Sequence, residues 1–436
     1  MNVELGTAKV NITPKVPVQL AGFAHRYGSF ESVKKELFLR AFYFLSKSDN
    51  SENQAAVIIT ADLIWWGTDR IAEMENKLQE RLGIPAGSTI FHATHNHSGP
   101  QTCKEFSTFL GICEDEYLAV LEDRLVEAVQ LAKDNTERIQ AERISTTCGI
   151  GINRRKAENG QIVMAPNPEG IVDPELIVIK FVNESHRLKA VLFHYACHPT
   201  TTGDNFVSSE FPGAASDKIE QTFHDNVVAG YLQGCCGDVR PNMMTESKFY
   251  RGDQGDVDRL GNLLAKHVMD CIGKNTWTKV SLSNLGITKS TLLLDFENLQ
   301  TVEQLTWNSN IEKLKMKEWR RRVQTNLPRF AAGLPLEFRL LSLGGNLSFL
   351  AMNAEMVVEY GIYIKQAFNG RVIPLPYSNG MIGYVPTEKQ LMEGGYESKE
   401  FIYYFALPAP FDRSIEKRIK EKMRRLIGKE ITPLDR

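Results

Sequence analysis

The amino-acid sequence predicts a mixed α/β fold in which central β-sheets are flanked by helices. Apolar runs of strand length alternate with amphipathic segments along most of the chain. The 436 residues, 42% of them hydrophobic and 24% charged, are enough for a large buried core. Because we find no internal repeat and no linker rich in Pro, Gly or Ser, we expect a single domain over residues 1–436, with a helical extension from about 400 to 436.

The first half of the chain shows regular strand and helix patterns. Residues 55–66 form a continuous apolar run that predicts a buried strand. Thr68 is expected to cap a helix that ends at Gly83. A strand over residues 88–95 and an amphipathic helix over 116–133 follow.

The second half continues the alternation of strands and helices. In order, we expect strands at residues 175–182, 189–197 and 227–233, helices at 256–272 and 302–323, a hairpin at 338–355 with a Gly-Gly-Asn turn, and a last helix from Ser414 to Gly428. This order favours an α/β or mixed architecture over an all-β one.

Charge and composition restrict the partner. Lys and Arg together number 51 against 53 Asp and Glu, so no overall field would hold the chain on nucleic acid or on an anionic membrane. The basic run at 320–322 lies near acidic residues of the same predicted helix and has no aromatic stacking pattern, which indicates a solvated helix face. We therefore expect a small-molecule substrate, no nucleic acid and no stable membrane association, and the sequence leaves open whether the chain forms a homo-oligomer.

Cysteine usage and the first residues bear on location. The seven cysteines are odd in number and lack CxxC spacing, which predicts reduced thiols. The chain starts without a signal-peptide pattern, and no apolar run reaches the length of a membrane span. We expect a cytoplasmic protein. Cys235 lies near candidate histidines, but a buried free thiol is the simpler interpretation.

The segment FHATHNHSGP, residues 91–100, places His95 and His97 two positions apart at the exit of an apolar strand. Residues at i and i+2 of an extended chain project to the same side, so the two imidazoles can address one point. An isolated pair of this kind is equally compatible with hydrogen-bonded structural histidines. Further candidate groups at other strand ends are needed to decide.

Three other apolar strands also end in polar side chains. These are His198 after residues 189–197, Asp238, Arg240 and Asn242 after the glycines that follow 227–233, and Glu355 at the end of the hairpin. Strand exits are where open α/β sheets usually build their sites. Two imidazoles and a carboxylate with an open position predict a catalytic zinc site, which would lower the pKa of bound water to about 7. His194, deeper in its strand, is expected to be structural.

Eight segments, in order, resemble motifs of the neutral ceramidase family, which are zinc-dependent amidases that split N-acyl sphingosines. They are GTAKVNITP, ATHNHSGP, NRR, HPTTT, SSEFPGAASDKIE, QGCCGDVRPN, NAE and YVPTEKQLMEGGYE. The resemblance runs from about residue 5 to 400, which is the length of the family's catalytic domain.

The resemblance implies roles for residues of this chain. His95, His198 and Glu355 match the zinc ligands, and Tyr384 matches a tyrosine that approaches the metal. By the same comparison His97 would act in proton transfer, Tyr396 would be an active-site tyrosine, and Asn153 and Arg154 would lie near the substrate.

The chain also departs from the family pattern. The ceramidases have GDVSPN where this chain has GDVRPN, so Arg240 replaces a serine that matters for their activity. An arginine there would bind a carboxylate or phosphate, polarise a carbonyl oxygen, or turn away into a structural ion pair. The chain also ends at Arg436 without the immunoglobulin-like C-terminal domain of the ceramidases and without their secretion signal. These departures disfavour a membrane lipid as substrate.

The sequence thus predicts a cytoplasmic zinc hydrolase with a single ceramidase-like domain, cleaving an amide bond in a small polar or anionic N-acyl compound. We expect His95, His198, Glu355 and Tyr384 to bind zinc and His97, Arg240 and Tyr396 to act in catalysis, with Asn153, Arg154, Asp238 and Asn242 at the substrate. Two alternatives remain at this point. One is the same metal site acting on an ester or glycosidic bond, and the other is a non-catalytic, metal-stabilised binding protein.

Overall fold

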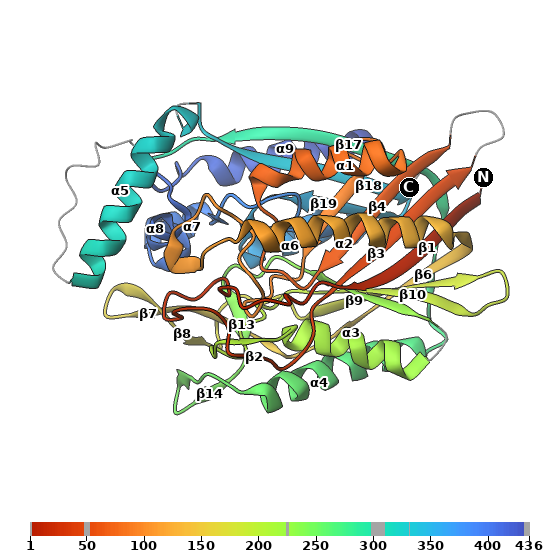
Figure 1. The fold of residues 1–436 in the computed structure, drawn as a ribbon, viewed down its shortest axis with the longest axis horizontal. Helices are drawn as coiled ribbons and strands as arrows, with labels where there is room; N and C mark the ends of the chain where they lie inside the picture. Colours follow the sequence, from red (N-terminus) through yellow and green to blue (C-terminus); the bar gives the residue numbers. More distant parts are fainter. Residues whose placement is uncertain (1, 48–52, 224–225, 298–309, 331, 431–436) are drawn as a thin grey trace.

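In the computed structural model the chain forms stacked layers of helices and sheets (Figure 1). The structure describes residues 2–430, apart from 48–52, 224–225, 298–309 and 331. This arrangement confirms the mixed α/β class that the sequence predicts.

The larger sheet forms the base on which the candidate site is built. Its strands, from one edge to the other, are β12 (Val228–Gln233), β10 (Leu188–Tyr195), β9 (Glu175–Asn183), β6 (Glu137–Thr147), β1 (Asn2–Asn11), β3 (Phe38–Lys47), β4 (Gln54–Ala61) and β5 (Thr89–Ala93), and β16 (Thr278–Val280) pairs with β6. The pairs β10–β12 and β4–β5 are parallel, whereas the other neighbours are antiparallel. The sheet is therefore mixed.

A smaller sheet packs against one face of the larger one. It consists of β17 (Leu282–Leu294), β18 (Leu334–Gly344), β19 (Leu347–Met352) and β21 (Val372–Leu375). Phe44 and Leu192 of the larger sheet share a core with Leu341 and Phe349 of the smaller one. Since side chains alternate along a strand, the residues between them face the opposite way, toward helices.

Helices cover the outer faces of both sheets and one end of the molecule (Figure 1). They are α1 (Ile71–Leu82), α2 (Asp115–Asp134), α3 (Glu210–Phe223), α4 (Gln254–Ile272), α5 (Asn310–Phe330), α6 (Val358–Ala367), α7 (Glu388–Glu393), α8 (Ile402–Phe405) and α9 (Ile415–Glu430). On the larger sheet, Phe193 of β10 packs with Phe211 of α3 and Leu260 of α4, and α2 lies over β1 and β3. Strands covered on both faces appear in the sequence as continuous apolar runs.

Short pairings outside the two main sheets position the loops. They are β2 (Ser32–Val33) with β11 (Phe206–Val207), β7 (Gly151–Glu158) with β8 (Gln161–Asn167) and β13 (Val239–Pro241), β14 (Met244–Thr245) with β15 (Lys248–Phe249), and β20 (Glu355–Met356) with β22 (Tyr384–Val385). Short helical turns lie at η1 (Thr68–Arg70), η2 (Thr108–Leu110) and η4 (Tyr396–Glu400).

The structure confirms most predicted elements and corrects several boundaries. The predicted strand over 55–66 already ends at Ala61, and the strand that should reach Glu355 ends at Met352. Thr68 is not a helix cap, because its hydroxyl exchanges hydrogen bonds with the backbone of Met381. The described part of the predicted 302–323 helix starts at Asn310 and continues to Phe330, and 302–309 lie outside the described residues.

Three expectations about composition can also be compared with the fold. Within the described ranges no helix is both long and apolar enough to cross a membrane. The seven cysteines are all free, and six of them are buried. In the basic run only Arg321 is exposed. The Arg322 side chain is 16% exposed, pairs with Glu318 one turn away and donates to the carbonyl of Lys104, so it packs α5 onto a neighbouring segment rather than facing solvent.

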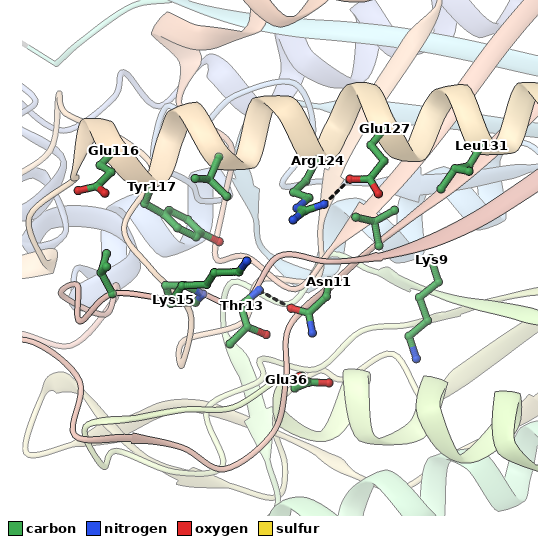
Figure 2. Close-up of a pocket in the computed structure, with 14 residues that line it drawn as sticks. Lys9, Asn11, Thr13, Lys15, Glu36, Glu116, Tyr117, Arg124, Glu127 and Leu131 are labelled. Carbon is green, nitrogen blue, oxygen red and sulfur yellow. Dashed lines mark hydrogen bonds and ion pairs between the residues drawn. The ribbon is translucent and has the colours of Figure 1, made fainter.

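A groove of about 780 Å³ lies between α2 and the segment that follows β1 (Figure 2). Its lining includes Lys15, Tyr117 and Arg124, and Figure 2 shows Arg124 paired with Glu127. None of the residues that line it is a candidate site residue of the sequence analysis. This groove is therefore separate from the predicted chemistry.

The close approach of α2 to β1 makes Gly6 a sensitive position. A Cβ atom at Gly6 would lie 1.7 Å from the carbonyl oxygen of Ala132, so Gly6→Ala must push α2 away from the sheet. Because overpacking a rigid core costs about 1–3 kcal/mol, we expect a clear fall in the denaturation midpoint of this variant. Gly149→Ala is the matched control, since nothing lies within 4 Å of its Cβ position. Equal midpoints for the two variants would contradict the close contact.

Candidate functional site

His95 lies in the loop that follows β5. Its backbone has a φ of 61°, a left-handed conformation, rather than the extended one that the i, i+2 spacing suggests. The Nδ1 atom of His95 lies 2.9 Å from the carbonyl oxygen of Ile64, and the ring stacks on Tyr377 at 4.0 Å between centroids. The side chain of Asn96 bonds to the backbone of Asp62, Ser208 and Ser98 and so fixes the loop.

His198 follows β10, and its Nδ1, like that of His95, faces a backbone carbonyl. Its Nδ1 lies 2.6 Å from the carbonyl oxygen of Cys236 and 3.1 Å from that of Val239. An Nδ1 that donates to a carbonyl leaves the Nε2 lone pair free, which is the usual arrangement of metal-binding histidines.

Glu355 enters the site through the parallel pairing of β20 with β22. In this register Glu355 lies opposite Tyr384, although the two are 29 positions apart in the chain. The Oε1 atom of Glu355 is 3.2 Å from His95 Nε2 and 2.7 Å from His198 Nε2. His97 Nε2 is 3.2 Å from His95 Nε2, and all four side chains are buried. The structure thus brings together the groups that the sequence placed at separate strand exits.

This cluster fits a cation. With Nδ1 of both rings bonded to carbonyls, the Nε2 atoms and the carboxylate oxygen that face each other are all acceptors, and His198 Nε2 and Glu355 Oε1 have no hydrogen-bond partner. A proton on one ring would satisfy only one of these contacts, whereas a divalent cation satisfies all of them. Burial lowers the pKa of His198 to about 4 and that of His97 well below its usual value, which keeps both rings neutral. His95, His97 and His198 form a possible metal-binding group within the described residues.

Tyr384, Arg154 and Tyr396 lie beside this cluster. Tyr384 lies opposite Glu355 in the β20–β22 register, and its hydroxyl accepts a hydrogen bond from Arg154 Nη2 at 3.0 Å. Burial raises the pKa of Tyr384 well above its usual value. Arg154 is held by Glu397, 2.7 Å from its Nε, and the rings of Tyr384 and Tyr396 are 5.4 Å apart.

Three residues predicted at the substrate have other contacts. Asp238 accepts hydrogen bonds from the backbone N–H of Val358 and from Gln390, and so fixes the start of α6. Asn153 donates to the carbonyl of Ile171 and accepts from the N–H of Arg155. Asn242 is exposed. The polar atoms of Asp238 and Asn153 thus hold neighbouring segments together, and none of the three has a recorded contact with the histidine cluster.

Arg240 lies on β13, next to the loop that carries His198. Its Nη2 is 3.4 Å from the carbonyl oxygen of Thr200, its guanidinium carbon is 4.3 Å from the ring of Phe249, and its Nε has no partner. Burial, together with the nearby Arg154, lowers its pKa to about 10. Among the described residues no carboxylate lies within ion-pair distance of Arg240, so the structural ion pair that the sequence left open is absent there.

Sequence reasoning missed positioning residues at the site. Asn96 lies between the two histidines of HNH, and Glu397 follows Tyr396 directly, so both were inside recognised motifs. Only the structure shows that Asn96 fixes the loop and that Glu397 pairs with both Arg154 and Arg155. Two residues that the sequence analysis expected to be structural, His194 and Cys235, are buried away from solvent. His194 is buried with Nε2 3.0 Å from the carbonyl oxygen of Pro374, and burial raises the pKa of the Cys235 thiol.

The chain is similar to known proteins in part of its sequence and in its fold. Residues 3–267 match the family described as neutral/alkaline non-lysosomal ceramidase, N-terminal. The fold is similar to the crystal structure of neutral ceramidase from Pseudomonas aeruginosa, with a TM-score of 0.76 and 16% identity over 100% of this chain and 76% of that one. A structure described as ceramidase complexed with C2 matches with a TM-score of 0.75 and 15% identity over the same shares of the two chains. No curated protein matches the sequence significantly.

If the cluster binds a cation, elemental analysis of the purified protein should find one divalent ion per chain. His95→Ala and His198→Ala should each lose most of it, because each removes an acceptor that no neighbour replaces. His267→Ala, on the partly exposed side of α4, serves as the control and should keep its metal. Metal content that is unchanged in both cluster variants would make these histidines structural.

Proposed function

Because the chain belongs to the neutral/alkaline non-lysosomal ceramidase family and is therefore a hydrolase, we propose that it uses zinc to cleave an amide bond in a small polar or anionic N-acyl compound. The observation that carries this proposal is the convergence of His95, His198 and Glu355 on one buried point, with only acceptor atoms facing each other. Two imidazoles and a carboxylate with room for a further ligand are a common donor set of catalytic zinc.

In this proposal His95, His198 and Glu355 hold the ion, with the Tyr384 hydroxyl beside them. Bound zinc would supply Lewis acidity, making water a nucleophile at neutral pH and polarising the scissile carbonyl. The carbonyls of Ile64 and Cys236 keep the two ligand imidazoles in the tautomer that this requires.

His97 is suited to move a proton. Its Nδ1 has no hydrogen-bond partner, so no carbonyl fixes its tautomer, unlike those of His95 and His198. Its Nε2 faces the cluster at 3.2 Å from His95 Nε2, within reach of a water molecule or a leaving amine held there. Burial lowers the pKa of His97, so the ring is neutral at neutral pH. A neutral ring can accept a proton from water and return it to the amine.

Arg154 and the tyrosines would stabilise negative charge that develops on the carbonyl oxygen. Arg154 donates to the Tyr384 hydroxyl, so it orients that phenol, and its positive charge makes the Tyr384 hydroxyl a stronger donor. Its guanidinium carbon also lies 5.8 Å from the centre of the Tyr396 ring. Preorganised donors of this kind act on the transition state more than on the substrate. Arg240 would orient the substrate from the His198 loop.

The kind of bond needs its own test, since family membership does not fix the reaction. Matched amide and ester substrates with the same acyl group separate the proposal from the ester alternative, and an aryl glycoside tests the glycosidic one. A higher kcat/KM for the amide, relative to its uncatalysed rate, supports the amidase proposal.

We also propose a cytoplasmic location, supported by the seven unpaired thiols. Fractionation of cells that express the full-length native gene tests this proposal. Recovery of the protein outside the cytoplasm, or with oxidised cysteines, would contradict it.

Chelation and mutation of His97 should have different effects. A chelator should abolish hydrolysis of N-acyl substrates and zinc should restore it, because the acceptor cluster has no activity without its ion. His97→Ala should lower kcat by about 10²–10⁴-fold while the protein keeps its metal, as expected for loss of a general base. Activity and metal content are measured on the same preparations, with His267→Ala as control. Loss of metal in His97→Ala would instead assign His97 as a ligand.

A further inference from the structure

Three arginines surround the loop between His198 and Gly203, and none of them has a carboxylate partner among the described residues. They are Arg26, Arg240 and Arg251, which lie on three separate segments of the chain. The sequence singled out only Arg240. Their contacts with the loop and with the surroundings of His97 place all three at one side of the candidate site.

Arg26 reaches the loop and the candidate proton-transfer histidine. Its Nε donates to the carbonyl of Gly203 at 3.3 Å, its Nη1 donates to the carbonyls of His97 and Ala21, and its Nη2 donates to the Ser98 hydroxyl at 3.5 Å. Arg26 therefore contributes charge to the site and no free donor. Its guanidinium carbon lies 4.7 Å from the centre of the Phe23 ring, which is itself 5.0 Å from the ring of His97. The Phe23 ring thus lies between the Arg26 guanidinium and the imidazole of His97, the candidate proton-transfer group.

Arg251 lies against the same Phe23 ring. Its guanidinium carbon is 5.8 Å from the ring centre, and its Nη1 contacts His25. A Cβ atom at Gly203 would lie 2.8 Å from Arg251 Nη1, so the absence of a side chain at Gly203 is what lets this guanidinium approach the loop. Arg251 is exposed, so the solvent can reach this side of the cluster.

Arg240 approaches the loop at Thr200 and adds unsatisfied donors. Its Nη2 donates to the Thr200 carbonyl, whereas its buried Nε has no partner. The hydroxyl of Thr200 is also buried without a partner. A buried donor without an acceptor is costly in a finished fold, and it indicates a group that pairs with something the chain itself does not supply.

Buried arginines elsewhere in the described residues have carboxylate partners. Arg40, Arg154, Arg155 and Arg339 each pair with a carboxylate. Near the loop, the carboxylate of Glu210 is occupied by the N–H groups of Thr201 and Thr202. Burial, and repulsion from Arg251, lower the pKa values of both Arg26 and Arg240 to about 10, so these two remain charged at neutral pH.

We propose that Arg240 and Arg251 bind a carboxylate or phosphate group of the substrate, with the positive charge of Arg26 beside them, while the amide of the substrate lies at the histidine cluster. This inference rests on the proposed function and names its substrate class, an N-acyl compound with an oxyanion a few bonds from the amide, such as an N-acylated amino acid or aminoalkyl phosphate. The planar guanidinium forks match both oxyanions, and the free Arg240 Nε and Thr200 hydroxyl supply further donors.

The test compares anionic and neutral members of matched substrate pairs. N-acetyl amino acids are compared with their methyl esters, and N-acetylaminoethyl phosphate with N-acetylethanolamine, on the zinc-loaded full-length enzyme. We expect kcat/KM at least tenfold higher for the anionic member of the preferred pair, and which pair shows the preference distinguishes a carboxylate from a phosphate. Equal values within both pairs would overturn the inference.

Arg251→Met tests the cluster without risk to the fold, because Arg251 is exposed. This variant should raise KM for the anionic substrate by about tenfold or more, leave its kcat within about twofold, and leave the neutral partner unaffected. Arg240→Lys keeps a charge but loses the fork, and should recover only part of the affinity. Arg259→Met is the control, since Arg259 is exposed on α4 and pairs with Asp256.

Calorimetry with inorganic phosphate and with acetate separates this inference from the proposed function. If the double variant Arg240→Met/Arg251→Met loses anion binding and Arg259→Met keeps it, the anion site is supported. This result stands even if no N-acyl substrate is hydrolysed, and in that case only the hydrolase proposal fails. Hydrolysis of neutral amides by wild type and variant alike, with phosphate affinity also unchanged, overturns the anion site and leaves the hydrolase proposal standing.

Discussion

The buried convergence of acceptor atoms at His95, His198 and Glu355 is the constraint on which the rest of the site depends. Two imidazole nitrogens and a carboxylate oxygen face each other at 2.7–3.2 Å, an arrangement that is unfavourable unless a cation lies among them. The carbonyls of Ile64 and Cys236 enforce it, because they take the Nδ1 protons of the two rings. Any change that frees those carbonyls would let a ring turn or exchange its tautomer. The cluster would then lose one of the lone pairs that can bind a cation.

The layered core makes this convergence rigid. The strands that precede His95 and His198, β5 and β10, are buried on both faces, so neither can tilt without opening a core. The loop after β5 then adopts a left-handed conformation at His95, which a non-glycine residue occupies only at a cost of about 1–2 kcal/mol. Hydrogen bonds from Asn96 and stacking on Tyr377 offset that cost.

The sequence could predict whatever depends on local pattern, and little that depends on distant partners. Apolar periodicity predicts the ends of helices α2 and α4 to within two residues. The position of His95 and His198 after apolar strands is what marked them as candidate site residues. Spacing does not tell what a polar side chain meets. Asp238 also follows an apolar strand, yet its partner is the N–H of Val358, 120 positions away, and the partner of Thr68 is Met381, 313 positions away. The same signal therefore marks residues that meet at one buried point and residues that bond elsewhere, and only the tertiary contacts separate them.

The arginines of the site are of two kinds, and the difference bears on the charge of the substrate. Arg154 and Arg155 both pair with Glu397, and Arg155 also pairs with Glu393, so the two arginines add little net charge to their surroundings. The loop arginines form no such ion pair within the described residues, so in the proposed site they would add positive charge beside the ion, which the nearby Glu210 and Asp204 offset in part. A neutral lipid amide would bind there without compensating that charge, whereas an oxyanion would be attracted by it and paired in a poorly solvated position. The arginine that replaces the ceramidase serine at position 240 is thus one member of a wider set of positive groups, and under our proposal this set would change the preferred substrate without changing the residues that would hold the ion.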